Sequence, residues 1–525
     1  MEKTLAAALG FIVLAALYLV KASTQSRKYP PGPRGWPVIG NLLDIPTFEE
    51  WVTYKSWSDE FTISNLLEQV SLRAHPAQPL AHPTAQTSHA DAASVSSLPT
   101  ARAPVLTACF SMGWTWWLLL MPNNSKWKSQ RRLFRQQFDG GAIKGHYPSV
   151  VRTNRDLLRR FIEQPANWRD HFRHMMGATI LETTYGIKAR TTDDPYIKTA
   201  EDAAASAARA IVPGAFMVDI FPFLRYVPAW VPGAGFQTQA RVWKKDTDTL
   251  FNAPFDAVKA AMADGTSGPS FCMRSLQDIE GAADLKAEEH HIQSAAAGMY
   301  IVTPHAPFRL SDTPLQTLTF LETFILAMVL HPAAQKKAQA ELDALLCSER
   351  LPTFADQEHL PYLAALVKEC WRWQVGMPLG IAHQLAEDDE YRGFFIPKGT
   401  IVLANSHQVM NDPAVYPDPS SFKPERFLKD GKADPAVRNP APAAFGYGRR
   451  ACPGRPLAEH LAWLSAASIL ALFDLSKVVD RDGKVVEPSG RYTSGVHPEP
   501  FECQIVPRPS ANADLIQSLA NPSSE

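Results

Sequence analysis

The segment that most constrains this chain lies near its carboxyl end, where Ala444 to Gly454 read Ala-Phe-Gly-Tyr-Gly-Arg-Arg-Ala-Cys-Pro-Gly. Glycines allow a backbone to approach a flat macrocycle and to aim amides at a sulfur atom, which stabilises the negative charge of a thiolate. A helix predicted from Leu457 to Leu472 begins just after the loop, so its positive amino end faces that sulfur. A lone Cys in a Gly-rich turn would indicate a small buried thiol, but the whole pattern favours a cysteine that binds haem iron.

Five positions define this loop as Phe-x-x-Gly-x-Arg-x-Cys-x-Gly. Cys452 is predicted to supply the axial sulfur of a haem, and Arg450 is predicted to neutralise a haem propionate. The other cofactor-binding positions that we assign in the loop are Phe445, Gly448 and Gly454.

Composition limits the class of protein. The 525 residues carry 52 basic and 53 acidic side chains, a net charge of −1, which gives no sign of a nucleic-acid partner. Hydrophobic residues make up 46% and charged residues 20%, a balance typical of a chain with a sizeable core. The sequence shows no internal repeat, so we expect one domain over 38–508, followed by a polar tail over 510–525.

The amino-terminal segment is predicted to be a membrane anchor. Residues 4–20 contain neither a charge nor a proline, and as a helix they would span about 25 Å, near the ~30 Å hydrocarbon thickness of a bilayer. Basic residues follow closely, so the positive-inside rule places the bulk of the chain in the cytosol. A cleaved signal peptide is the alternative, but no clean small-residue cleavage site precedes Lys21. Residues 29–37, rich in proline, are expected to form a semi-rigid hinge.

Three further motifs accompany the cysteine loop. They are Glu369-Cys370-Trp371-Arg372, the segment from Phe422 to Phe427, and Trp127-Lys128-Ser129-Gln130-Arg131. In these motifs and in their order the chain resembles the cytochrome P450 superfamily of haem-thiolate monooxygenases. The resemblance is closest to fungal microsomal members, and stretches such as Tyr226 to Trp230 are similar to mushroom enzymes of specialised metabolism. It implies a mainly α fold with small β-sheets and one N-terminal transmembrane helix.

The resemblance also implies a cofactor, haem b (iron protoporphyrin IX), and residues that hold it. Trp127 and Arg131 share a helical face, and an indole N–H and a guanidinium there suit the two propionates. His383 occupies a place where the family often contacts a propionate. Glu369, Arg372 and Arg426 are expected to form a buried structural network rather than to do chemistry.

Surface features suggest partners. Lys128, Arg132 and Arg135 form a basic stripe that is either a solvated helix face or a docking site for NADPH-cytochrome P450 reductase. The segment from Val212 to Phe236, with four prolines and six aromatic residues, is either a core connection or a pocket roof that dips towards membrane lipid. The expected location is the endoplasmic reticulum membrane, with a single span and a cytosolic catalytic domain.

Two segments depart from the family pattern. Residues 61–107 lack aromatic residues in their central part and are expected to be a loop or disordered. Residues 301–321 contain three prolines where the family has a long central helix, and each proline costs such a helix about 3 kcal/mol or more. Asp312 and Thr313 are the one acid–alcohol pair there that resembles a proton relay. Our hypothesis is that both segments derive from mis-joined or retained intervening sequence; the competing hypothesis is a divergent protein with impaired oxygen activation.

The implied reaction is monooxygenation, of EC class 1.14. A small lipophilic secondary metabolite, of terpenoid or alkaloid type, would be oxidised with dioxygen and electrons derived from NADPH. The alternatives are a haem-thiolate isomerase or dehydratase, which needs no proton relay, and a catalytically impaired haem-binding membrane protein.

Overall fold

The computed structural model contains two compact units. The first unit comprises Met1–Ala101 and Ala382–Asn405, and the second comprises Arg102–Ile381 and Ser406–Glu525. The residues that the structure describes are 29–30, 32, 50–60, 69–72, 100–102, 112–211, 216, 218, 222–231, 235–301, 316–391, 394–493, 497–509 and 513–520. The predicted anchor over 4–20 and most of the hinge over 29–37 therefore lie outside the described residues.

A search of the described residues for membrane spans finds no single helix that is long and apolar enough to cross a bilayer. Two consecutive helices reach the required length and hydropathy only when they are taken together: Thr317–Leu330 and Pro332–Leu346. They are bent by 104° relative to each other.

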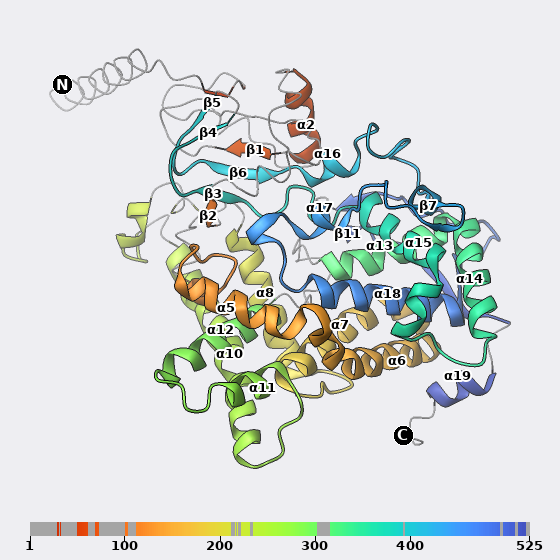
Figure 1. Ribbon diagram of the computed structural model, residues 1–525, viewed down its shortest axis with the longest axis horizontal. Helices are drawn as coiled ribbons and strands as arrows, with labels where there is room; N and C mark the ends of the chain where they lie inside the picture. The colour runs from red at the N-terminus through yellow and green to blue at the C-terminus, as the bar shows by residue number, and fades with distance from the viewer. Residues whose placement is uncertain are drawn as a thin grey trace. The chain divides into compact units, whose positions relative to one another are not determined.

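In its described part, the first unit has helix α2 (Glu50–Glu60) and small antiparallel sheets (Figure 1). A four-stranded sheet has the order β1 (Gln69–Leu72), β6 (Ile401–Ala404), β3 (His383–Leu385) and β2 (Thr100–Arg102). Helix α2 (Glu50–Glu60) and the pair β4 (Asp389–Tyr391) and β5 (Phe394–Ile396) complete the unit. Leu385, Ile396 and Val402 form its small apolar cluster.

The strands β1 and β2 correct one expectation. Residues 61–107 were expected to be loop or disordered, yet Gln69 pairs with Ala404 and Leu72 with Ile401 in an antiparallel ladder. Gln69–Leu72 alternates polar and apolar residues, a pattern typical of a strand. The average composition of residues 61–107 conceals this short pattern.

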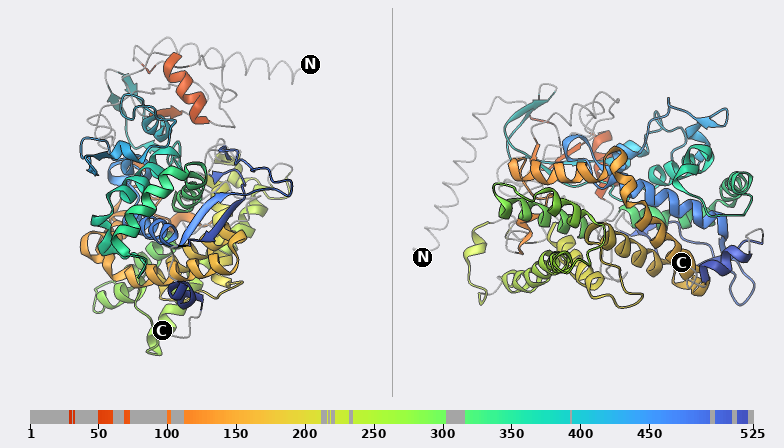
Figure 2. Two further views of the ribbon diagram at one scale, coloured as in Figure 1. Left: turned by 90° about the vertical axis from the view of Figure 1, so that its right-hand side faces the viewer. Right: turned by 60° about the horizontal axis from the view of Figure 1, so that its bottom comes forward.

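The second unit is mainly helical (Figures 1 and 2). Its α-helices are α5 (Ser125–Phe138), α6 (Tyr147–Glu163), α7 (Trp168–Tyr185), α8 (Pro195–Ile211), α10 (Phe236–Ala263), α11 (Phe271–Asp278), α12 (Leu285–Tyr300), α13 (Gln316–Leu330), α14 (Pro332–Leu346), α15 (Pro361–Trp373), α16 (Ser406–Met410), α17 (Ala441–Phe445), α18 (Arg455–Leu472) and α19 (Ala513–Ala520). Short 3₁₀ helices are η2 (Trp114–Trp116), η3 (Gly140–His146), η4 (Pro165–Asn167), η5 (Pro222–Tyr226), η6 (Phe354–His359), η7 (Pro424–Phe427) and η8 (Gly448–Arg450).

The strands of the second unit form antiparallel pairs. These are β7 (Leu428–Lys429) with β8 (Lys432–Ala433), β9 (Phe473–Lys477) with β12 (Cys503–Pro507), and β10 (Tyr492–Thr493) with β11 (His497–Pro498). The ribbon of β9 and β12 is the blue pair of strands in Figure 2. Gln335 of α14 exchanges two hydrogen bonds of 2.8 Å with the backbone of Leu475, so a side chain satisfies a strand that would otherwise present unpaired groups. The fold class is thus mainly α with small β-sheets, as expected.

Helices α13 and α18 form the centre of the core. Both are apolar around nearly their whole circumference, and such helices are buried in protein. Leu321, Phe324 and Ile325 of α13 and Leu461 and Ile469 of α18 are almost completely shielded from solvent. Helix α18 follows the cysteine loop directly, and Phe320 of α13 contacts Trp371, which packs on Phe445 of the loop.

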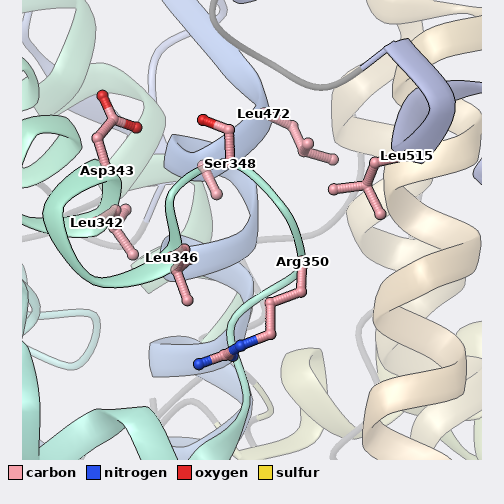
Figure 3. Close-up of a pocket in the computed structure, with 8 residues that line it drawn as sticks. Leu342, Asp343, Leu346, Ser348, Arg350, Leu472 and Leu515 are labelled. Carbon is pink, nitrogen blue, oxygen red and sulfur yellow. The ribbon is translucent and has the colours of Figure 1, made fainter.

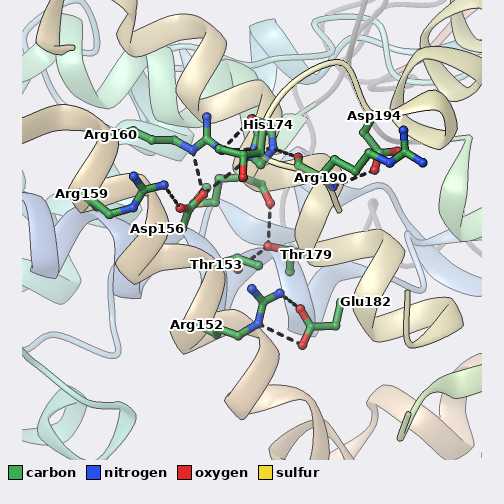
Figure 4. Close-up of polar contacts among 12 residues, drawn as sticks. Arg152, Thr153, Asp156, Arg159, Arg160, His174, Thr179, Glu182, Arg190 and Asp194 are labelled. Atoms are coloured by element: carbon green, nitrogen blue, oxygen red, sulfur yellow. Dashed lines mark hydrogen bonds and ion pairs between the residues drawn. The ribbon is translucent and has the colours of Figure 1, made fainter. Parts of the chain in front are cut away.

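Helices α6 and α7 are joined by polar contacts (Figure 4). Arg152 forms an ion pair with Glu182, and Thr153 hydrogen-bonds to Thr179 at 2.7 Å. Near them, burial tends to raise the pKa of Asp156, but hydrogen bonds from two neighbouring arginines outweigh it and lower the pKa below its ordinary value. The pair of helices is therefore held by charge as well as by apolar packing.

Two further boundaries differ from expectation. Residues 301–321 were expected to interrupt a helix, but α13 already begins at Gln316, two positions after Pro314, because no later proline prevents it. Residues 510–525 were expected to be a polar tail, yet α19 packs against α6 and buries parts of Leu515 and Leu519 against the core.

Candidate active site around Cys452

The backbone of the cysteine loop is held by hydrogen bonds and by glycines. The amide of Cys452 donates to the carbonyl of Phe445 at 2.7 Å, and the amide of Ala451 donates to that of Gly448 at 3.2 Å. Gly446 has a φ of 82° and Gly448 a φ of 56°, values that residues with a β-carbon rarely adopt. The glycine spacing therefore shapes the turn that presents the sulfur.

Opposing effects act on the Cys452 thiol. Burial raises its pKa, whereas hydrogen bonds from the Gly454 and Arg455 amides and the charge of Arg131 lower it, and the net pKa remains above its ordinary value. The two amides belong to the amino end of α18, as the sequence predicted. Protein surrounds the Cys452 sulfur closely enough for burial to raise its pKa. Cys452 as a whole is nevertheless exposed to solvent. A bound cation would deprotonate this thiol.

Gly454 contributes through its amide rather than through its small size. A β-carbon built there would meet the Cys452 sulfur at 3.9 Å, an ordinary van der Waals contact. The need for glycine is clearer at Gly446 and Gly448, where the positive φ is the constraint.

Three of the predicted haem-binding residues come together beside the loop. Arg450 donates to the carbonyls of Met121 at 2.8 Å and Leu118 at 3.4 Å, and its guanidinium carbon lies 4.6 Å from the ring centre of Trp127. Burial and the charge of Arg131 lower the pKa of Arg450 to about 10. Two guanidinium groups are thus held within repulsive range of each other.

Arg131 provides a direct test of whether these residues fit a haem. Its Nε is buried and makes no hydrogen bond within the described part of the chain, and such a donor costs about 1–3 kcal/mol if it stays unpaired. Burial lowers the pKa of Arg131, and the neighbouring Cys452 raises it. A thiol with two amides aimed at it matches the sulfur ligation of a haem, and two neighbouring guanidinium groups, Arg131 and Arg450, match its two carboxylates. The residues present fit the group.

Aromatic side chains support the loop from the core. Phe445 packs against Trp371 of α15 with ring centres 4.9 Å apart, and Trp371 stacks on Phe320 of α13 at 4.4 Å. The sequence prediction gave no role to Trp371. Its place inside the Glu369–Arg372 motif of a buried helix was the signal that could have identified it.

The structure also brings together the three residues of the predicted network. Arg372 donates two hydrogen bonds of 2.8 Å to the carboxylate of Glu369, and Arg426 donates a third at 3.1 Å. Both arginines also donate to backbone carbonyls, among them those of Met410 and Ser421. Glu369 and Arg372 are fully buried, so each charge depends on the others.

Other predicted residues lie elsewhere. Lys128, Arg132 and Arg135 are exposed on α5. His383 begins β3 in the first unit, where it pairs with Val402. The predicted relay residues of 301–321, Asp312 and Thr313, lie outside the described residues.

A small pocket lies apart from this cluster (Figure 3). It is formed where α14, α18 and α19 meet, and Leu342, Leu346, Leu472 and Leu515 give it apolar walls. None of the predicted haem-binding residues lines it.

Comparison with known proteins identifies the family. The family model described as Cytochrome P450 matches residues 30–244 and 312–505. The unmatched stretch between them includes 301–311, part of one departing segment, whereas 61–107 falls inside the match. Members of this family use haem iron as their cofactor.

Relatives extend the match over nearly the whole chain. Tryptamine 4-monooxygenase of Psilocybe cyanescens is 37% identical over 506 residues, which cover 95% of this chain and 97% of the relative. Cytochrome P450 monooxygenase 98 of Postia placenta is 38% identical over 511 residues, which cover 96% of this chain and 95% of the relative. A cytochrome P450 monooxygenase of Armillaria gallica is 36% identical, with 98% and 99% covered. The chain therefore belongs to the cytochrome P450 family, among its fungal haem-dependent monooxygenases.

Proposed function

We propose that this monooxygenase oxidises a small lipophilic secondary metabolite and that Cys452 is the axial ligand of its haem iron. The observation that carries the proposal is the loop itself, which aims two backbone amides and a cationic side chain at one sulfur atom. When bound, the haem would supply the binding and reductive activation of dioxygen.

The residues around the loop would have distinct roles. The amides of Gly454 and Arg455 would hold the thiolate charge, and Arg131 and Arg450 would bind the propionates with Trp127 beside them. Phe445 and Trp371 would fix the loop by packing. Glu369, Arg372 and Arg426 would lock the same side of the fold without touching the substrate.

Electrons are proposed to come from NADPH through cytochrome P450 reductase. Lys128, Arg132 and Arg135 are exposed on α5, and the same helix carries Trp127 and Arg131 towards the cysteine loop. A basic face there would steer an acidic flavoprotein towards the haem.

The enzyme is proposed to act at the endoplasmic reticulum membrane, with residues 4–20 as its single span. A second contact with lipid is supported by the segment around Tyr226 and Trp230, whose residues are 73% and 82% exposed. Large aromatic side chains at such exposure suit the interface of a bilayer. Other aromatic residues of the segment, Phe216 and Phe236, pack against the core, which supports a core connection for that part of the segment beside the proposed lipid contact.

The substrate class rests on the relatives. One of them bears the name tryptamine 4-monooxygenase, which supports an indole-type alkaloid as substrate, and a terpenoid remains the other candidate. Incubation with a reductase, NADPH and a panel of both classes, followed by product analysis, distinguishes them.

The test of the function is spectroscopic and begins with Cys452→Ser. The wild-type protein, produced with ample haem precursor, should show the reduced, carbon-monoxide-bound absorption of a thiolate haem, and the variant should lose it. Cys347→Ser, which changes an exposed thiol elsewhere, should leave the spectrum unchanged. A folded wild-type protein that binds no haem, or binds it equally well without Cys452, would contradict the proposal.

A second candidate function is favoured by one observation. Helix α12 ends at Tyr300 and α13 begins at Gln316, and the sequence between them contains three prolines, residues that oppose a continuous α-helix. The chain would then bind haem but activate oxygen poorly, or catalyse an isomerisation or dehydration. Peroxide release without hydroxylated product, or product formed without NADPH, would support these alternatives.

A further inference from the structure

The surface around Trp230 combines exposed apolar side chains with an uneven distribution of charge. Tyr226 and Trp230 are 73% and 82% exposed, and Val242 of α10 is 56% exposed. Residues 220–245 contain four basic side chains and no acidic one. In the right-hand view of Figure 2, the yellow ribbon that includes η5 stands apart from the neighbouring helices. This part of the second unit therefore presents apolar and cationic groups together to solvent.

Helix α10 holds two of the cations next to the aromatic segment. Gln237, in the first turn of α10, donates hydrogen bonds to the carbonyls of Arg225 and Val227 and so fixes the η5 segment on this helix. Arg241 and Lys245 follow Gln237 at intervals of four, so the three residues form one row along the helix, with about 6 Å between successive members. The two cations therefore lie on the face of α10 to which the aromatic segment is attached.

The cations of this surface lack acidic partners. Arg225, Arg241 and Lys245 are exposed, and within the part of the chain that the structure describes none of them forms an ion pair with a carboxylate. The neighbouring Lys244, by contrast, pairs with Asp248 at 2.6 Å. Three positive charges are thus available to an external anion.

The acidic residue that follows this row does not neutralise it. Asp246 is partly buried, and burial together with the charge of Asp202 on α8 raises its pKa. The charge of Lys245 acts in the opposite direction and does not outweigh these two effects. One carboxylate against three cations leaves the surface positively charged.

Arg225 holds its guanidinium in a position suited to phosphate. The guanidinium carbon lies 4.6 Å from the centre of the Tyr226 ring, and the group donates a hydrogen bond to the Tyr226 hydroxyl. A guanidinium has five N–H donors, and two parallel donors match a phosphate group. Arg225 can therefore bind a headgroup phosphate while Tyr226 and Trp230 lie in the bilayer interface.

We propose that this surface binds an anionic phospholipid bilayer. The residues of this cationic–aromatic surface are Arg225, Tyr226, Trp230, Arg241, Val242 and Lys245. Its apolar side chains enter the bilayer interface, and its cations bind the phosphate and carboxylate oxygens of the headgroups. The inference rests on the lipid contact proposed above, to which it adds the class of lipid.

The experiment follows hydrogen exchange by mass spectrometry in the full-length, haem-loaded protein in lipid nanodiscs. Discs of phosphatidylcholine alone are compared with discs that contain about 30% phosphatidylserine, which makes their surface anionic. Each cation near such a surface strengthens binding about fivefold, so the peptide over residues 222–231 should exchange at least about tenfold more slowly in the anionic discs. This difference should shrink at about 0.5 M salt, which screens the charges.

Variants of α10 test the cations outside the measured peptide. Arg241→Gln should reduce the difference between the two kinds of disc by about fivefold, and Arg241→Gln/Lys245→Gln should abolish most of it. Lys259→Gln is the matched control, because it removes one exposed charge from the same helix about 27 Å beyond Arg241, farther than the ~8 Å screening length at physiological salt. The control should retain the whole difference, and circular dichroism verifies that each variant is folded.

Equal exchange in the two kinds of disc, or a difference that persists in Arg241→Gln/Lys245→Gln, would overturn the inference. If neutral discs slow exchange relative to protein in detergent and anionic discs slow it no further, the lipid contact stands and the preference for anionic lipid is refuted. Exchange that neither lipid slows would refute the lipid contact together with this inference.

Discussion

At the scale of single residues, charge balance explains the cysteine site. At Cys452, burial disfavours the thiolate, whereas two backbone amides and the charge of Arg131 favour it. Arg131 is the counterpart: its buried Nε makes no hydrogen bond among the described residues. Each group is unfavourable in isolation, and a haem with one iron and two carboxylates would satisfy both.

Arg131 offers a prediction at this scale. Arg131→Gln should weaken haem retention by roughly ten- to a hundredfold, because a charge-assisted hydrogen bond of ~1.5–3 kcal/mol to a propionate is lost. Transfer of haem to apomyoglobin, followed by absorbance, measures the rate of loss. Arg132→Gln, at the next and exposed position of α5, should retain haem like the wild type. Equal retention in both variants would show that Arg131 does not bind the cofactor.

At the scale of elements, ionic and packing contacts hold specific helices to specific loops. The motif of α15 supplies both kinds of contact, because Glu369 and Arg372 bind the segment before β7 while Trp371 lies between α13 and the cysteine loop. The order of the residues along one helix thus connects three parts of the fold.

The Glu369 network gives a prediction about stability. Glu369→Ala leaves Arg372 buried without its carboxylate, so the free energy of unfolding should fall by about 3–5 kcal/mol. Arg372→Ala should cost a similar amount, and the double variant Glu369→Ala/Arg372→Ala should cost less than the sum of the two, because the two fully buried charges are removed together and only Arg426 loses a partner. Urea unfolding followed by tryptophan fluorescence measures all three variants. Additive losses would contradict a coupled network.

The short helix η3 gives a prediction about pH. Burial and the nearby Arg274 lower the pKa of His146 to about 4, whereas the unfolded value is about 6.5. As the pH falls, the His146 side chain takes up a proton in the unfolded chain before it does so in the folded protein. Its contribution to the free energy of unfolding is therefore fully present above about pH 6.5 and is lost as the pH falls towards 4. The loss between pH 7 and pH 5 should be about 2 kcal/mol.

Urea unfolding at pH 7 and pH 5 measures this loss. His146→Gln should remove this part of the pH dependence, and His359→Gln, at an exposed position, should retain it. A slope that is the same in His146→Gln as in the wild type would show that another group is responsible.

At the scale of the whole molecule, the proposed second contact with lipid at Tyr226 and Trp230 gives a prediction. A chain that lacks residues 1–28 should still bind phospholipid vesicles, and replacing Tyr226 and Trp230 with Ser should abolish most of that binding, since each loses an aromatic surface suited to the bilayer interface. Vesicle co-sedimentation measures it. Val506→Ser, at a residue that is 52% exposed on β12, is the control and should bind normally.

Much of the site followed from the sequence because its motifs are local. The turn around Cys452 needs glycines at set positions, α18 starts immediately after it, and residues three or four apart on α5 and α15 share a helical face whatever surrounds them. The helical fold class followed for the same reason.

What only the tertiary structure decided involves residues far apart in the chain. The stacking of Phe320, Trp371 and Phe445, the position of Arg450 over Trp127, and the attachment of His497 to Glu322 join segments separated by tens to hundreds of residues. Composition also gave wrong predictions at β1, where pairing with β6 forms a strand, and at α19, where a helix packs on α6. Local sequence determines turns and helical faces through backbone geometry, whereas long-range contacts depend on how those faces fill space together.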